Sequence, residues 1–468
     1  MNSMMSRRAL LCGAAGTVLN AGMSPWAHAL SSGIELLAAQ ARFQPEASTS
    51  AEALAFLHRG RPCFEGPALR FQHGQVLEVN FRSDLAEGTT IHWHGMRLPN
   101  GMDGDSEFVQ MPTKPGESWR YRFQLLDPGT HWFHSHHRSW SQVARGLYGM
   151  AVVENPNEPM LPEATLILDD WSLDPANAAH LNVHKNDWDI EGQHGEILTV
   201  NGRVSPTISV PESGWLRLRF LNASTARLFH PVLSSDDRVF AIAFDGFGIP
   251  HDQVKTFPTL GPGQRMDLLV NFGTTIGTES ISVQDRLSGA SLAKLTKTDA
   301  LRPNLDPDVP RAFARYMPEE LRPWAKPHQR HELRLEGGFG GEMQSAWFDD
   351  VLLSNAQLQS QEKFWSLNGV AQGWVEPLFD GFVGETVELR ILNQTDFPHT
   401  MHLHGQHFLV IETPMAPEIG LFRDSITVPA RESATILIRL QAIGWWPLHC
   451  HMLGHQAAGM STWFNVLI

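Results

Sequence analysis

The sequence predicts an all-β protein made of three tandem β-sandwich domains. Segments such as residues 76–79, 215–218 and 386–389 alternate, or nearly alternate, apolar and polar side chains, as half-buried strands do. The 39 glycines and 30 prolines separate short segments, which favours sandwiches over helical bundles. The 468 residues leave room for three domains of ordinary size after a leader.

Internal repetition supports the tandem arrangement. Residues 74–95 align without gaps on residues 384–405, and residues 129–136 align on residues 444–451. The copies lie about 300 residues apart in the chain. Repeats so far apart indicate tandem domains and exclude a short-period solenoid.

A middle copy of the repeat is fainter. Residues 218–222 resemble residues 389–393, but no His-x-His pair follows them. Only His230 lies near, and a lone histidine is more often a structural residue than a ligand. The second domain is therefore expected to carry no metal ligands.

These patterns set the expected boundaries. The first domain spans residues 40–155, the second residues 156–295 and the third residues 346–468. Residues 296–345 are rich in proline and charge and are expected to be a linker, with a short helix near residues 311–316.

The N-terminal 29 residues read as a signal peptide. Two adjacent arginines, Arg7 and Arg8, precede an apolar stretch, and Ala27-His28-Ala29 is a small-x-small cleavage site. Such a leader predicts export by the twin-arginine machinery, which carries folded proteins, and a periplasmic location. Nothing later in the chain offers 18 uninterrupted apolar residues.

Paired histidines are the main chemical signal. Side chains at positions i and i+2 lie on one face of a strand, so each His-x-His pair can present two imidazoles in one direction. Four pairs, one of them enclosing a cysteine, are hard to explain by composition and indicate bound metal. The pairs are His92 and His94, His134 and His136, His402 and His404, and His449 and His451.

The last pair belongs to a second pattern. Cys450 lies between its two histidines, His455 and Met460 follow, and His399 precedes the third pair. Two histidines, a thiolate and a weak axial methionine form the ligand set of a blue-copper electron-transfer site. Neighbours in a strand point to opposite faces, so Cys450 can bind one metal while the histidines beside it bind others. The first repeat has Ser135 in place of this cysteine.

Together these segments resemble the multicopper oxidases, a family that includes laccases and bacterial copper oxidases. The order and separation of the motifs match as well. The resemblance implies three cupredoxin-like Greek-key β-sandwiches. The matching segments are residues 91–95, 129–136, 399–405 and 449–460.

The resemblance also implies four copper ions and their ligands. The type 1 copper would take His399, Cys450, His455 and the axial Met460, and the type 2 copper would take His92 and His402. The pair of type 3 coppers would take the remaining six histidines, which are His94, His134, His136, His404, His449 and His451.

The implied activity is one-electron oxidation of a reductant at the type 1 copper, through Cys450, coupled to four-electron reduction of O2 to water. The expected reductants are phenols or aromatic amines, which need an accessible edge of a type 1 histidine. A periplasmic Cu(I) oxidase acting in copper tolerance is the alternative. Such enzymes often carry a methionine-rich insertion, whereas residues 296–350 contain only Met317 and Met343. A copper-free scaffold of the same fold is a further alternative.

Carboxylates are expected to assist the reaction. Asp103 matches the position where the family keeps a carboxylate beside the oxygen-reducing cluster, and we predict that it relays protons; a turn residue before a glycine is its plainer role. Gln456 stands where relatives often place a glutamate, and an amide cannot deliver protons in the same way. Asp396, Asp349 and Asp350 are candidate carboxylates near the reductant.

Charge and cysteine content limit the partners. The leader contains two arginines and no acidic residue, so its removal takes the net charge from −14 to about −16 and argues against binding to nucleic acid or anionic membranes. Removal also takes Cys12, which leaves Cys63 without a disulfide partner if Cys450 binds copper. We expect a monomer.

Overall fold

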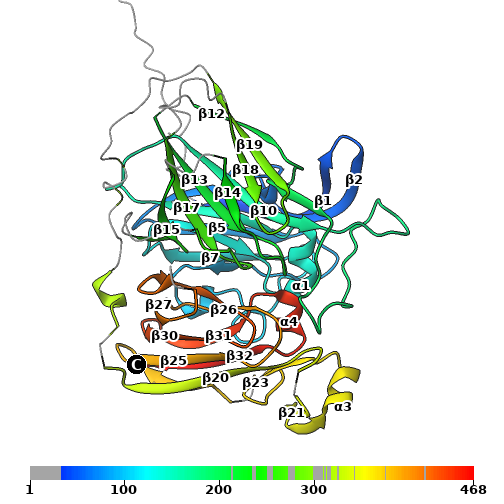
Figure 1. Cartoon of the computed structure of the whole chain (residues 1–468), viewed down its shortest axis with the longest axis vertical. Coiled ribbons are helices and arrows are strands. Elements are labelled where there is room, and N and C mark those ends of the chain that lie inside the picture. Colours follow the sequence, from blue (N-terminus) through cyan, green and yellow to red (C-terminus); the bar gives the residue numbers. More distant parts are fainter. Residues whose placement is uncertain are drawn as a thin grey trace, which may run out of the picture. The chain divides into compact units, whose positions relative to one another are not determined.

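The computed structural model describes most of the chain after the leader. The described residues are 33–211, 214–234, 239–249, 257–271, 280–298, 309, 313, 318–323, 326–341, 343–374, 376–415 and 418–468. They form an all-β protein in which six sheets of four to six strands are arranged as three sandwiches (Figure 1). The predicted signal peptide lies outside the described residues.

The first sandwich contains a five-stranded and a four-stranded sheet. The larger sheet is made of β1 (Ile34–Glu46), β2 (Thr49–His58), β3 (Arg61–Pro62), β5 (Val76–Ser83) and β7 (Ser118–Gln124). The smaller is made of β4 (Leu69–Gln72), β6 (His92–His94), β8 (Gly129–His134) and β9 (Tyr148–Glu154). Four helical turns accompany them: η1 (Cys63–Glu65), η2 (Asn100–Met102), α1 (Ser139–Gln142) and η3 (Val143–Arg145).

The second sandwich pairs a six-stranded sheet with a four-stranded one. The larger contains β10 (Glu163–Trp171), β11 (Ile197–Val200), β13 (Trp215–Asn222), β15 (Val239–Phe244), β16 (Phe247–Gly248) and β17 (Arg265–Asn271). The smaller contains β12 (Thr207–Pro211), β14 (Pro231–Leu233), β18 (Ser280–Asp285) and β19 (Ser291–Thr298).

The third sandwich has a six-stranded and a five-stranded sheet. The larger contains β20 (Gln329–Gly337), β23 (Trp365–Leu367), β25 (Thr386–Asn393), β27 (Phe408–Glu412), β28 (Phe422–Arg423) and β30 (Ser433–Arg439). The smaller contains β24 (Asp380–Phe382), β26 (His399–Leu403), β29 (Ser425–Val428), β31 (Gly444–Cys450) and β32 (Ser461–Leu467). Outside the two sheets lie the hairpin β21 (Ser345–Phe348) and β22 (Val351–Ser354) and the turns η4 (Glu319–Leu321), α3 (Asn355–Ser360) and α4 (Leu453–Ala457).

The three sandwiches repeat one strand arrangement. The first strand of each, β1, β10 or β20, pairs in parallel with β5, β13 or β25. The latter strand then pairs antiparallel with β7, β17 or β30. The repetition in the sequence is therefore a repetition of topology, and it includes the middle copy.

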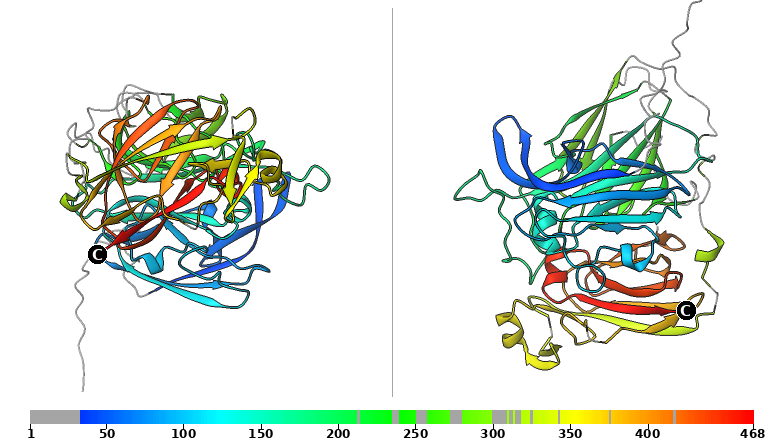
Figure 2. Two further views of the ribbon diagram at one scale, coloured as in Figure 1. Left: turned by 90° about the horizontal axis from the view of Figure 1, so that it is seen from below. Right: turned by 180° about the vertical axis from the view of Figure 1, so that it is seen from behind.

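The first and third sandwiches share a hydrophobic core. One cluster of buried side chains runs from Leu36 to Val153 in the first sandwich and from Leu333 to Val466 in the third. In Figures 1 and 2 the cyan strands of the first sandwich lie next to the orange and red strands of the third. Most of the second sandwich has its own cluster, from Ala164 to Leu295.

The domain boundaries differ from those expected. Strand β1 begins at Ile34, six residues before the expected start of the first domain. Strand β20 (Gln329–Gly337) lies inside the range 296–345 expected to be a linker, yet it is a full member of the third sandwich. Its exposed and half-exposed positions carry charges, while Leu333 and Leu335 are buried. Because of these charges the sequence of the segment indicates a linker and not a strand. The helix expected near residues 311–316 falls mostly outside the described residues.

Within the described part of the chain, no helix has the length and apolar character needed to cross a membrane. Cys63 forms no disulfide, as predicted; it is buried, and burial raises its pKa to about 12.

Candidate metal centre

The register of two strand pairs brings the His-x-His pairs together. In the first sandwich His92 of β6 lies opposite His134 of β8, and in the third His402 of β26 lies opposite His449 of β31. The two halves then meet face to face. The Nε2 atoms of His92 and His402 are 3.5 Å apart although 310 residues separate them in the chain. All eight paired histidines are buried.

Stacked rings join the two halves. The His94 ring lies on the His402 ring at 3.7 Å between centroids, and the His92 ring lies on the His404 ring at 3.8 Å. One histidine of each stack comes from the first sandwich and the other from the third. The centre is therefore complete only when both sandwiches are folded and docked.

Backbone carbonyls orient four of the imidazoles. In each case a carbonyl oxygen lies 2.9–3.0 Å from Nδ1, which leaves Nε2 to face the centre. The pairs are His92 with Asp103, His134 with Ser135, His402 with Asp424 and His449 with Cys450.

Carboxylates orient two more imidazoles. His404 Nδ1 lies 2.8 Å from Asp103 Oδ2, and His136 Nδ1 lies 2.9 Å from Asp105 Oδ2. Asp103 also approaches His92, so one carboxylate from the first sandwich contacts histidines of both. Gly104 makes this turn possible: its φ is +80°, and a Cβ there would lie 1.9 Å from the Ile91 carbonyl oxygen.

Asp424 holds His94 in the opposite orientation. His94 Nε2 lies 3.2 Å from Asp424 Oδ1, so its Nδ1 is the ring nitrogen left over. Arg265 of the second sandwich donates two hydrogen bonds to this carboxylate, at 2.9 and 2.6 Å. Burial alone would raise the pKa of Asp424, but the Arg265 guanidinium outweighs it, so the carboxylate stays ionised.

The nitrogens that face the centre fit metal ions. His134 Nε2, His94 Nδ1 and both ring nitrogens of His451 are buried without a hydrogen-bond partner among the described residues. Groups of donor atoms lie within 4.8 Å of one another, and one such group is His136, His404 and His449. Buried imidazole nitrogens converging without partners are costly unless a metal binds them. The donor set therefore suits copper.

A second donor group lies on the other side of Cys450. Its Sγ is 3.7 Å from His399 Nδ1 and 3.8 Å from His455 Nδ1, and all three side chains are fully buried. Met460 is fully buried as well, and its backbone closes the loop by accepting a hydrogen bond from Cys450 N at 3.0 Å. Cys450 thus lies between this group and the histidine cluster, because His449 and His451 flank it.

The outer edges of this second group are covered. His455 Nε2 donates to the Ile190 carbonyl oxygen at 2.6 Å, and His399 Nε2 lies 2.8 Å from Thr395 Oγ1. Both imidazoles have no exposed surface. The expectation of an accessible histidine edge is therefore wrong for the described residues: a loop of the second sandwich covers His455.

Burial keeps nearly all of the imidazoles neutral. Burial lowers the pKa of His451 and of His455 to about 3, and the net pKa shift of every other ligand histidine for which a shift is seen is downward, with His136 as the exception. For His136 burial also lowers the pKa, but Asp105 outweighs it and the net shift is upward. Burial raises the pKa of Cys450 to about 12, so its thiolate requires a bound metal.

Other candidate residues lie outside the donor groups. Asp396 is exposed and paired with Arg431, and Asp349 and Asp350 are exposed. Gln456 accepts a hydrogen bond from Ser139 Oγ at 2.9 Å. His230, expected to be structural, contacts Thr259 Oγ1 through Nδ1 at 3.1 Å.

Sequence reasoning missed three residues of the centre. Asp105 stands two positions after Asp103, so the pair of acids in a glycine turn was the available signal. Asp424 was signalled by an Arg-Asp pair inside an apolar strand region. Arg265 carried no signal, because its contact with Asp424 joins positions 159 residues apart.

Comparison with known proteins agrees with this geometry. Family models described as multicopper oxidase match residues 62–158 and 349–468, the two regions that carry the histidines. Multicopper oxidase MmcO of Mycobacterium tuberculosis is 26% identical over 451 residues, which cover 86% of this chain and 82% of its own. Cell division protein FtsP of Xenorhabdus nematophila is 32% identical over 241 residues, but these cover 48% of this chain and 49% of FtsP.

Solved structures extend the likeness to the whole fold. The crystal structure of a multi-copper oxidase from Pseudomonas thermotolerans aligns with a TM-score of 0.74 and 27% identity, covering 93% of this chain and 99% of the other. The chain belongs to the multicopper oxidase family. It is accordingly an oxidoreductase of the class that uses copper and O2.

The low pKa values of the buried histidines predict how acid affects the copper-free protein. An unfolded histidine titrates near 6.5, whereas His451 and His455 titrate at about 3 in the folded chain. The unfolded state therefore binds more protons between these values, and stability falls as the pH falls from 6.5 towards 3, by about 1.4 kcal/mol per pH unit for each such histidine. Thermal unfolding at pH 7.5, 5.5 and 4.5 and constant ionic strength measures the loss. The variant His455→Gln should show a shallower slope, and a melting temperature that does not change with pH would contradict the prediction.

Proposed function

We propose that the protein is a laccase-like oxidase that takes single electrons from phenols or aromatic amines and reduces O2 to water. The observation that carries the proposal is the position of Cys450, which is buried between two histidines in the chain. Its thiol belongs to the group with His399 and His455, and the neighbouring His449 belongs to the histidine cluster. A thiolate group suits electron uptake, and an all-histidine cluster suits oxygen reduction.

The proposed ligand assignment follows the donor groups. His399, Cys450, His455 and Met460 would bind a type 1 copper, and a type 2 copper would take the Nε2 atoms of His92 and His402. The unpartnered nitrogens and ring contacts support two type 3 sites, one of His136, His404 and His449 and one of His94, His134 and His451. When bound, these four coppers would store the four electrons that O2 requires.

The protein's own part is to orient ligands and supply protons. Asp103 accepts the Nδ1–H of His404, and its other oxygen, Oδ1, has no hydrogen bond among the described residues and lies 3.3 Å from His92 Nδ1. A buried carboxylate with a free oxygen beside the cluster is suited to proton transfer as well as to orientation. Gln456 would instead serve as a hydrogen-bond acceptor that ties α4 to α1.

Oxidation of Cu(I) is the second candidate for the reductant. A cavity near His455 is lined by Met452 and His194, whose sulfur and imidazole suit a soft metal ion. Against it, the described residues show no group of three His, Cys, Asp or Glu donors in that cavity. Organic reductants are therefore the primary proposal. A copper-free scaffold is disfavoured because every ligand position is filled.

The proposed setting is the periplasm. The N-terminal residues 1–29, with Arg7 and Arg8, have the features of a twin-arginine leader. Export of the folded protein would suit a chain whose metal centre forms only after two distant sandwiches dock. We propose that the mature protein is a monomer.

Copper content and colour test the assignment. The loaded protein should contain about four coppers per chain and show an intense blue band. Cys450→Ser should abolish the blue band while leaving about three coppers, because the eight histidines of the cluster remain. Metal analysis and absorption spectra measure both. Cys63→Ser, the matched change at the other cysteine, should keep the colour. A copper-loaded protein with one copper per chain or none would refute the oxidase.

A second prediction separates proton transfer from structure at Asp103. Asp103→Asn preserves size and a hydrogen-bond acceptor but cannot carry the proton. Reoxidation by O2 should slow by about 100-fold and its pH profile should change, whereas reduction by a phenol should change by less than about threefold. Stopped-flow absorbance follows the two half-reactions separately. Equal slowing of both would identify Asp103 as a purely structural residue.

A third prediction decides between the two reductants. A laccase-like enzyme should oxidise methoxyphenols at an unchanged rate when a selective Cu(I) chelator is added to fully loaded enzyme. A Cu(I) oxidase would need added copper to shuttle electrons, so the chelator would stop phenol turnover. Steady-state rates of dimethoxyphenol oxidation with and without chelator, beside rates of direct Cu(I) oxidation, distinguish them. Collapse of phenol turnover together with rapid Cu(I) oxidation would establish the metal oxidase.

A further inference from the structure

A loop of the second sandwich closes over the proposed electron-accepting group. We refer to residues 185–194 as the strap. Its Ile190 carbonyl oxygen accepts the hydrogen bond from His455 Nε2 at 2.6 Å. Gly192 lies so close that a Cβ there would come within 2.9 Å of Ala226 and 3.9 Å of His455 Nε2. A reductant therefore meets the strap before it can meet the imidazole.

The strap is fixed to the third sandwich at Trp188 and Asp189. The Trp188 carbonyl accepts a hydrogen bond from Trp365 Nε1 at 2.5 Å, and the Asp189 carbonyl accepts one from Phe339 N at 2.6 Å. The Trp188 indole is buried and packs on Gly454, where a Cβ would lie 2.6 Å from its Cδ1. These anchors make the strap a fixed cover and not a loose loop.

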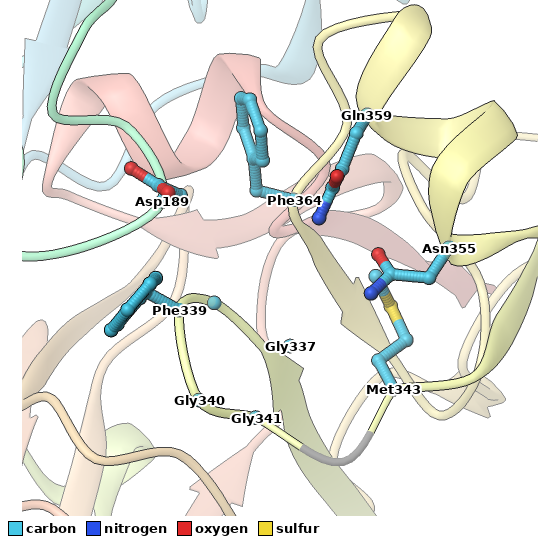
Figure 3. Close-up of a pocket in the computed structure, with 10 residues that line it drawn as sticks. Asp189, Gly337, Phe339, Gly340, Gly341, Met343, Asn355, Gln359 and Phe364 are labelled. Carbon is cyan, nitrogen blue, oxygen red and sulfur yellow. The ribbon is translucent and has the colours of Figure 1, made fainter.

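Two cavities lie beside the strap. The one between Asp189, Phe364 and the glycine-rich loop 337–341 has a volume of about 120 Å³ (Figure 3). The other has about 320 Å³ and is lined by Glu191, His194, Ala226, Arg227, Leu228, Asp285, Leu287, Ser288, Pro398 and Met452. Pockets for small organic molecules begin at about 300 Å³, so only the second can take a substituted aromatic ring.

The larger cavity adjoins the type 1 ligands on two sides. Pro398 precedes His399, and Glu191 follows Ile190, whose carbonyl contacts His455. A ring in this cavity would thus lie against residues next to both histidines: Pro398, which is bonded to His399, and Glu191, which follows the Ile190 that contacts His455.

One charge in this cavity is free to act on a ligand. Asp285 accepts hydrogen bonds from the backbone N–H groups of His230 and Ser288 and from the Ser288 hydroxyl. Arg227 donates to Asp170 Oδ2 at 2.9 Å and to the Gly195 carbonyl. Glu191 is exposed and has no ion pair or hydrogen bond among the described residues. Beside its apolar residues and the exposed imidazole of His194, the cavity therefore presents one carboxylate that no described residue pairs with, Glu191.

We infer that the reductant docks in this cavity against the strap, not against a bare histidine edge, and that Glu191 makes the site prefer cationic and neutral aromatic reductants over anionic ones. This inference rests on the proposed function, because it assumes that the molecule bound in the cavity is the reductant. Aromatic amines and their cations are the favoured class, and sulfonated dyes are disfavoured. The apolar part of the wall, with Leu228, Leu287 and Pro398, suits the ring.

Binding of redox-inert probes tests the inference without turnover. Benzyltrimethylammonium and benzenesulfonate carry the same ring with opposite charge, and calorimetric titration of the copper-loaded enzyme measures the affinity for each. Glu191→Lys should weaken binding of the cation by about fivefold and strengthen binding of the sulfonate by a similar factor. The matched control is Asp396→Lys, an equal change of charge at an exposed acid outside the cavity. It should change neither affinity by more than about twofold.

A second variant tests the place of binding independently of charge. Leu287 is 57% exposed, so Leu287→Trp should leave the fold intact while filling the cavity. It should raise the KM for amines and phenols by about tenfold with the blue absorption band unchanged. Unchanged probe affinities in Glu191→Lys, or equal changes in the Asp396→Lys control, would overturn the inference.

Failure of the site and failure of the proposed function give different results. Probe binding that depends on Glu191, in an enzyme that oxidises neither phenols nor amines, would retain the site and refute the laccase-like activity. If the enzyme oxidises phenols but probe binding is unchanged in Glu191→Lys and Leu287→Trp, the activity would be retained and the site refuted.

Discussion

The structure depends on the burial of eight imidazoles between two sandwiches that are far apart in the chain. Burying neutral imidazoles whose nitrogens have no hydrogen-bond partner is unfavourable. Metal binding offsets this free-energy cost and so stabilises the docked interface. Asp103 and Asp424 make the arrangement possible, because each fixes histidines of both sandwiches. Loss of the Asp103 carboxylate would release His404, and loss of the Asp424 carboxylate would release His94, whereas backbone carbonyls would still hold His92 and His402. The two donor groups are connected directly through the chain, because Cys450 belongs to one and the histidines bonded to it on either side belong to the other cluster.

Among the described residues, none of the second sandwich belongs to the donor groups, and yet this sandwich controls the centre from two sides. Arg265 keeps Asp424 ionised in a fully buried place, and Gly263 lies so close to His94 and His451 that a Cβ there would come within 3.0–3.1 Å of their rings. Its φ of +84° also favours glycine. The strap from the same sandwich covers His455. The second sandwich, whose sequence has no His-x-His pair, therefore supports and covers the centre.

The covered histidine edge changes how substrate preference is understood in this protein. A reductant that cannot contact the imidazole directly is selected by the shape and charge of the cavity beside the strap. The three acids that the sequence suggested, Asp396, Asp349 and Asp350, lie outside that cavity. Glu191 does line the cavity, although this residue belongs to the second sandwich and lies 208 positions before His399 in the chain.

The sequence by itself determined what is local or repeated: the strand alternation, the tandem sandwiches, the twelve proposed ligands and the position of Asp103. Each of these follows from spacing within a strand or turn, or from comparison of one repeat with another. Tertiary structure alone decided the rest. The charged strand β20 became part of a sheet because it pairs with β25, in which Val387 lies opposite Gln329 although 58 positions separate them. The roles of Asp424, Arg265 and Glu191 arise from contacts between sandwiches, and no local pattern records which distant surfaces will meet.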